Sequence, residues 1–85
     1  MGRVRRNKPR NLARKLHKIR VELLGLSQSE MARALGLQIH YAAVSNYELG
    51  TREPDLMVVL TYARLAEIPM EVLVDDNLDL PKPLS

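Results

Sequence analysis

Apolar residues recur along the chain at helical spacing, and glycine and proline divide this pattern into segments. The first segment, residues 9–24, carries apolar side chains at steps of three or four, which place them on one face of a helix. These side chains are Leu12, Leu16, Ile19 and Leu23. Gly25 follows and ends the helix, because glycine adopts positive φ at low steric cost.

The second segment opens with Ser27-Gln28-Ser29-Glu30, the sequence of a capping box. In this motif the Ser27 hydroxyl accepts a backbone N–H of the first turn, and the Glu30 side chain reaches back to the cap. Gly36 closes this short helix. Its inward-facing residues are Met31, Ala32 and Leu35.

Three further helices follow. The third is predicted over residues 40–49, the fourth begins at Asp55, and the last covers residues 69–73. The fourth repeats the helical period through Leu56, Val59, Leu60, Ala63 and Ala66. No strand pattern competes, so we predict an all-α, compact five-helix domain over residues 11–74, followed by an extended acidic, proline-containing tail over residues 75–85.

Length and composition restrict the class of protein. At 85 residues the chain suits one small domain, and without cysteine it has neither disulfides nor thiolate zinc sites, which fits a reducing cytosol. No apolar run approaches the ~20 residues that span a bilayer. We therefore expect a cytoplasmic protein that does not bind a membrane.

Charge is distributed unevenly. Nine of the thirteen Lys and Arg residues lie in residues 1–20, which contain no acidic residue, whereas the rest of the chain has four basic and ten acidic residues, a net charge of −6. This asymmetry favours an anionic partner near the N-terminus. Residues 1–10 form a basic arm with two open interpretations: a disordered, solubilising tail, or an arm that contacts nucleic acid.

The third helix has two different faces. With Val44 in the core, steps of 100° per residue place His40, Tyr47 and Glu48 on the inward side. The outward side carries Ala42, Ser45, Asn46 and Leu49. This side is small and uncharged, whereas a solvated face usually carries Lys or Glu.

Such a face fits the major groove of B-DNA. An Asn46 amide can donate to and accept from adenine, a Ser45 hydroxyl can pair with several base edges, and an Ala42 methyl can contact a thymine methyl. Backbone N–H groups at residues 27–29 would point at a phosphate. Residues 27–49 therefore predict a helix-turn-helix that presents its second helix to DNA.

At these positions the chain resembles the Cro-type, or xenobiotic-response-element, helix-turn-helix family of phage repressors and bacterial transcriptional regulators. The resemblance covers roughly residues 16–74. It rests on Gln28, Ala32, Gly36, Val44 and the run Tyr47-Glu48-Leu49-Gly50-Thr51-Arg52-Glu53-Pro54. It implies a repressor-like fold and a small transcriptional regulator, of bacterial or phage type, that binds double-stranded DNA at specific sequences.

Together, geometry and resemblance define the candidate site. The residues expected to contact bases are Tyr41, Ala42, Ser45 and Asn46. Those expected to contact phosphates are Ser27, Gln28 and Ser29 on one flank, Thr51 and Arg52 on the other, and Arg10 from the basic arm. Family members commonly bind two half-sites as symmetric dimers, so a homodimer is one further expectation.

The turn before the third helix departs from the family pattern. Seven residues separate Gly36 from Val44 where five are usual, so residues 37–41 must form a longer turn. Two interpretations of Tyr41 follow. It either begins the recognition helix and reaches a base or sugar, or it folds back onto the core.

A second departure concerns an ion pair. The family often pairs an arginine near the end of the first helix with the glutamate equivalent to Glu48, but Arg20 lies one residue further from Gly25 than usual. A buried pair between Arg20 and Glu48 is nevertheless the expectation.

Neither an enzyme nor a cofactor is expected. His17 and His40 lack metal-ligand spacing, and no Ser-His-Asp arrangement or phosphate-binding glycine loop can be assembled.

The leftover apolar residues are Val72, Val74, Leu78, Leu80 and Leu84. They form either a dimer surface or a tail folded back over its own core. A second function class is a protein-interaction module, such as an antitoxin or adaptor subunit whose acidic C-terminal part binds a protein partner.

Overall fold

The computed structural model describes residues 9–36 and 38–81. These residues form five α-helices and one π-helical segment, and no strand occurs among them. In chain order the elements are α1 (Leu12–Lys18), η1 (Ile19–Leu24), α2 (Gln28–Leu35), α3 (Tyr41–Leu49), α4 (Leu56–Ala66) and α5 (Met70–Val74). The predicted all-α class with five helices is confirmed, and η1 continues directly from α1.

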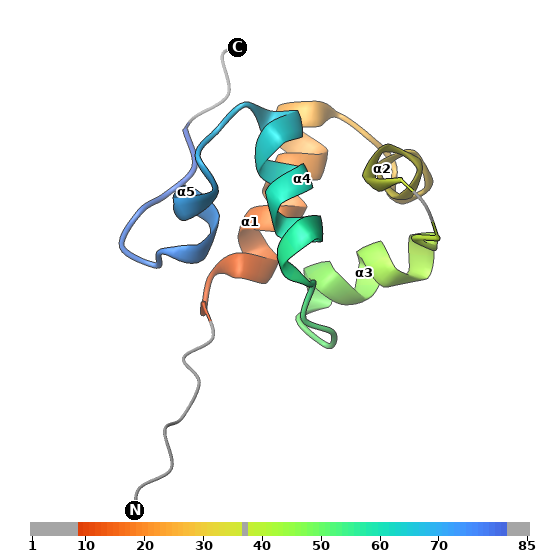
Figure 1. The fold of residues 1–85 in the computed structure, drawn as a ribbon, viewed down its shortest axis with the longest axis horizontal. Helices are drawn as coiled ribbons and strands as arrows, with labels where there is room; N and C mark the ends of the chain where they lie inside the picture. Colours follow the sequence, from red (N-terminus) through yellow and green to blue (C-terminus); the bar gives the residue numbers. More distant parts are fainter. Residues whose placement is uncertain (1–8, 37, 82–85) are drawn as a thin grey trace, which may run out of the picture.

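The helices enclose one apolar core. Figure 1 shows α1 and α4 in the middle, α2 and α3 together on one side, and α5 on the opposite side. Helix α3 contacts both α1 and α2, while α4 contacts α5 and η1. Fully buried side chains include Leu16, Ile19, Met31, Val44, Tyr62 and Leu73. Each helical element supplies one of these residues, so the inward side of α3 packs against a core to which all the elements contribute.

The capping groups that set the predicted helix boundaries are present in the structure. The Ser27 hydroxyl accepts from the Glu30 N–H at 3.0 Å, and Glu30 Oε1 accepts from the Ser27 N–H at 2.8 Å, so both bonds of the capping box form. Asp55 Oδ1 accepts the N–H of Val58 at 2.9 Å and starts α4. Gly50 ends α3 with a φ of 78°, in the left-handed region.

The end of the first helix is wound as a π-helix, which the apolar periodicity does not predict. In η1 the carbonyl of Arg20 accepts the N–H of Gly25, five residues later, and also that of Leu26 at 2.9 Å. A turn closed between residues i and i+5 holds one residue more than an α-helical turn. The segment therefore takes up the additional residue between Arg20 and Gly25, and Arg20 stays in place to meet Glu48.

The assignment of His40 to the inward side is wrong, and Leu56, which belongs to the predicted apolar stripe of the fourth helix, is not in the core. His40 is exposed, because α3 begins one residue later than predicted and the His40 ring caps it: Nδ1 accepts the N–H of Ala42 at 3.2 Å. Leu56 is 66% exposed, since it is the first residue of α4 and lies at the end of the helix. The buried residues of α4 are Val58, Val59, Tyr62 and Ala63.

Lys15 joins α1 to α5 and to the chain that follows α5. Its side chain is fully buried. The ammonium group donates to the carbonyl oxygens of Val72, Asp75 and Leu78 at 2.8, 3.0 and 2.8 Å. Three carbonyls match the three donors of a lysine, which is the condition under which a buried ammonium group is tolerated.

Residues 75–81, predicted as an extended tail, contain a turn at Asp76 and lie against α1. The Asp76 carboxylate accepts the backbone N–H groups of residues 10–11 at 2.9 and 3.1 Å, at the start of α1. Leu80 packs against the core. For the described residues this arrangement favours a tail folded back over its own core, while Leu84 lies outside the described residues.

Candidate nucleic-acid interface

Together, α1 and η1 form one continuous segment, the first helical rod. An ion pair between this rod and α3 holds the buried side of α3. Arg20 donates to the Glu48 carboxylate from Nε at 2.6 Å and from Nη2 at 3.0 Å, and from Nη1 to the carbonyl of Leu26 at 2.9 Å. The two charged side chains are 11% and 5% exposed. The expected pair between Arg20 and Glu48 is confirmed.

His17 is a third member of this cluster. Its Nδ1 lies 3.0 Å from Oε1 of Glu48. Burial raises the pKa of the Glu48 carboxyl, but the hydrogen bonds and charges of Arg20 and His17 outweigh burial and hold that pKa below its ordinary value. The sequence alone indicated no partner for His17, which lacks metal-ligand spacing and a catalytic arrangement. Its position three residues before Arg20, on the same helical face, was the available signal.

The opposite side of α3 faces away from the domain. Ala42 and Asn46 are exposed, Ser45 is half-buried and Leu49 is 71% exposed. The buried residues of this helix are Ala43, Val44 and Tyr47. Glu48 is the one charged residue of α3, and it is turned toward Arg20. The outward face predicted from the helical period is therefore present and uncharged.

The longer turn after α2 brings Tyr41 to the start of α3. Gly36 and Gln38 both have positive φ, 101° and 65°, and Leu37 between them lies outside the described residues. Tyr41 is 53% exposed, and its ring centroid lies 4.4 Å from that of His40. Of the two interpretations of Tyr41, the structure supports the one in which it begins the helix, since the ring is not in the core.

The residues that follow α3 orient Asn46. Its backbone carbonyl accepts the N–H groups of Thr51 at 3.0 Å and Arg52 at 3.3 Å. The Thr51 hydroxyl lies 3.3 Å from the same carbonyl and 3.2 Å from Oδ1 of the Asn46 side chain, so its proton can be donated to either oxygen. Oδ1 has a second lone pair, and the amide Nδ2 has two protons for an outside acceptor. Thr51, predicted as a phosphate contact, thus lies where its hydroxyl positions the Asn46 side chain. The sequence alone did not indicate this contact.

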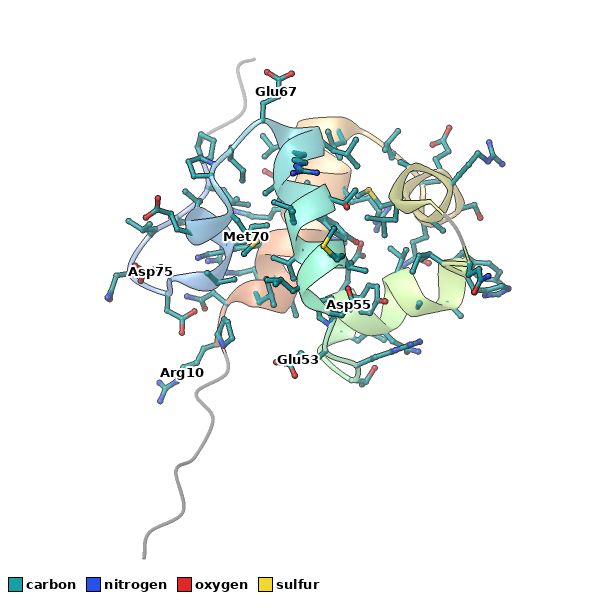
Figure 2. All side chains as sticks on the ribbon, viewed as in Figure 1. Arg10, Glu53, Asp55, Glu67, Met70 and Asp75 are labelled. Carbon is teal, nitrogen blue, oxygen red and sulfur yellow. The ribbon has the colours of Figure 1, made fainter. Side chains whose placement is uncertain are left out.

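Two arginines lie at the C-terminal end of α3. The Arg52 guanidinium carbon is 5.8 Å from the centroid of the Tyr47 ring, within cation–π range. Arg10 and Arg52 line the same surface pocket of about 250 Å³. Figure 2 shows Arg10 extending from the lower edge of the molecule, the edge that also carries Glu53. Residues 1–8 of the predicted basic arm lie outside the described residues.

The start of α2 forms the other flank. Ser27 and Ser29 are exposed, and Gln28 is half-buried. The capping box uses the backbone N–H groups of Ser27 and Glu30, which leaves those of Gln28 and Ser29 without an intrahelical acceptor. Hydrogen bonds from Ser27 lower the pKa of Glu30, so a carboxylate is also present here. A phosphate at this flank would meet the backbone N–H groups of Gln28 and Ser29. Ser27 can offer it only the hydroxyl, because its backbone N–H already binds Glu30.

Neither a metal site nor a membrane-spanning helix is present in the part of the chain that the structure describes. Among residues 9–36 and 38–81, no group of three or more His, Cys, Asp or Glu side chains is placed to hold a metal ion. No helix within these ranges has both the length and the apolar character needed to cross a bilayer.

Comparison with known proteins agrees with the geometry of α2 and α3. A family model described as helix-turn-helix matches residues 16–73, which is more than half of the chain. The comparison with curated proteins finds no match. The matched region contains α2, the longer turn and α3, and the family is one of DNA-binding regulators. The chain therefore belongs to the Cro/C1-type helix-turn-helix family.

Proposed function

We propose that the chain binds double-stranded DNA at specific sequences through the outward face of α3 and thereby regulates transcription. The observation that carries this proposal is the uncharged face on which Thr51 orients the amide of Asn46. An amide held in this way can donate from Nδ2 to adenine N7 and accept at Oδ1 from adenine N6. Membership of a DNA-binding family supports double-stranded DNA as the partner.

The remaining residues of the face have supporting roles in this proposal. Ala42 and Ser45 are small enough to let α3 approach base edges closely, and Ser45 offers a hydroxyl to them. Tyr41, exposed at the start of the helix, reaches a base or a sugar. These side chains read sequence, whereas contacts to the phosphates set the position of the helix in the groove.

The two flanks of α3 supply the phosphate contacts. Gln28 and Ser29 offer backbone donors at the start of α2, where the helix dipole favours an anion. Arg10 and Arg52 offer guanidinium groups at the other end of α3, and guanidinium groups bind phosphate oxygens well. With donors at both ends, the recognition helix is held between the two phosphate backbones that border the major groove.

The test is selection of bound duplexes from a random pool by the purified chain. We expect an enriched motif that contains an adenine–thymine pair sensitive to Asn46→Ala. A palindromic motif with half-sites about one helical turn apart would add that two copies bind together. Binding without enrichment, or binding that requires a second protein, would contradict the proposal and favour a protein-interaction module.

A further inference from the structure

We propose that Leu49 reads the 5-methyl group of a thymine in the bound duplex, an inference that rests on the function proposed above. Leu49 is 71% exposed, which is the largest value among the exposed large apolar side chains of the described residues. It is the last residue of α3 and follows Ser45 by four positions and Asn46 by three. Residues at these spacings share one helical face, so Leu49 extends the face of Ser45 and Asn46 by one turn.

Leucine restricts what this position can recognise. In the major groove the thymine 5-methyl is the apolar group, while the other exposed atoms of the base edges are hydrogen-bond donors and acceptors. Leu49 has neither a donor nor an acceptor to offer them. Against a guanine, a cytosine or an adenine edge it would displace water from polar atoms without replacing their hydrogen bonds, which is unfavourable. The side chain therefore selects thymine.

The surroundings of Leu49 hold it in place. Gly50 closes the helix directly after it, and the N–H groups of Thr51 and Arg52 bind the carbonyl of Asn46, so the last turn of α3 is fixed at its end. Three residues of an α-helix rise about 4.5 Å, and bases along a strand are spaced about 3.4 Å apart. The thymine read by Leu49 thus lies one or two base pairs from the adenine contacted by Asn46.

Two other exposed apolar side chains, Leu56 and Met57, begin α4. A second copy of the chain is therefore the alternative occupant of the Leu49 surface. Thymine is favoured because Leu49 lies on the same face as the polar residues that contact bases in the proposed function. Leu56 lies on another helix and provides a matched control, with 66% exposure against 71% for Leu49.

The experiment replaces each thymine of the selected duplex, one at a time, by deoxyuridine, which lacks only the 5-methyl group. For the unmodified chain we expect about fourfold weaker binding at the one position per bound copy that Leu49 contacts, equivalent to the ~0.8 kcal/mol of one buried methyl group. In Leu49→Ala this position no longer responds to the replacement, and the responses at other thymines persist. In Leu56→Ala the whole profile remains as in the unmodified chain.

A deoxyuridine profile that is the same in Leu49→Ala and the unmodified chain would overturn the proposal. So would an affinity loss in Leu49→Ala that is equal for all duplexes and is reproduced by Leu56→Ala, because that pattern places Leu49 between two copies. Both variants replace exposed side chains, so they are expected to melt like the parent chain. Failure to select any motif would contradict the proposed function itself. This outcome differs from those that contradict only the thymine contact of Leu49.

Discussion

The guanidinium of Arg20 and the carboxylate of Glu48 bind each other behind the recognition helix, at 2.6 and 3.0 Å. Arg20 comes from the π-helical end of the first helical rod, and Glu48 comes from the last turn of α3. The pair therefore ties the rotation of α3 about its axis to the first rod. The direction in which Asn46 and Leu49 point depends on this contact.

Loss of one partner of this pair is expected to destabilise the domain strongly. Arg20→Ala leaves a nearly buried carboxylate without its main partner, which should lower the free energy of unfolding by about 3 to 5 kcal/mol. The double variant Arg20→Met with Glu48→Leu should lose less, because no unpaired charge remains. Urea unfolding of the three chains measures both values. Equal stability of Arg20→Ala and the parent chain would show that the pair contributes little.

Acid should weaken the fold partly through Glu48. Its pKa is lowered in the folded chain, so the contribution to stability is present above the ordinary value of 4.5 and is lost as pH falls through the folded pKa. We therefore expect the free energy of unfolding to decrease below about pH 4.5. Glu48→Gln, which does not titrate, should show a smaller decrease. The same pH dependence in both chains, measured by urea unfolding, would assign the acid response to other carboxyls.

The buried ammonium group of Lys15 gives a third prediction. Lys15→Met keeps most of the side-chain length but removes the donors to the three carbonyls at residues 72, 75 and 78. A buried acceptor left unpaired costs about 1 to 3 kcal/mol, so a loss of at least this size is expected. Lys18→Met on the same helix is the control, since Lys18 is only half-buried. A stability loss no larger than that of the control would contradict the role of Lys15.

Arg52 and Asn46 should affect DNA binding in different ways. Arg52→Ala removes a proposed phosphate contact, so the slope of log K against log salt should decrease by about 0.9 on any duplex. Asn46→Ala should weaken binding to the selected sequence by about 1 to 3 kcal/mol and leave binding to random duplexes nearly unchanged. Titrations at several salt concentrations separate the two effects. If both variants weaken selected and random DNA equally, the assigned roles are wrong.

The features that sequence predicted correctly depend on neighbours along the chain. The capping box of Ser27 and Glu30 and the glycine that ends α3 act within one turn of their own helix. The outward face of α3 follows from a period of 100° per residue once Val44 is placed in the core. These rules require no knowledge of how the helices pack, so they could be applied to the sequence directly.

The features that were missed depend on contacts that a helical period does not describe, and most of these contacts join residues far apart along the chain. Lys15 is buried because carbonyls about sixty residues later surround its ammonium group, and no local pattern places a lysine in a core. The role of His17 requires knowing that α3 crosses the first rod near it. The contact of Thr51 with Asn46 requires the path of the chain after Gly50, which a helical period does not describe.

The π-helical segment yields a prediction about chain length. Val21 is an exposed residue of η1, and its deletion should convert the wide turn to an ordinary α-helical one while Leu23 and Arg20 keep their partners. The domain should therefore stay folded. Deletion of Thr61 in the middle of α4 has no wide turn to absorb it, and it rotates Tyr62 and all later residues of that helix by about 100° away from the core. Far-UV circular dichroism during heating should show cooperative melting for the first deletion and none for the second. Loss of cooperative melting in both would mean that η1 is required by the fold and does not simply accommodate an additional residue.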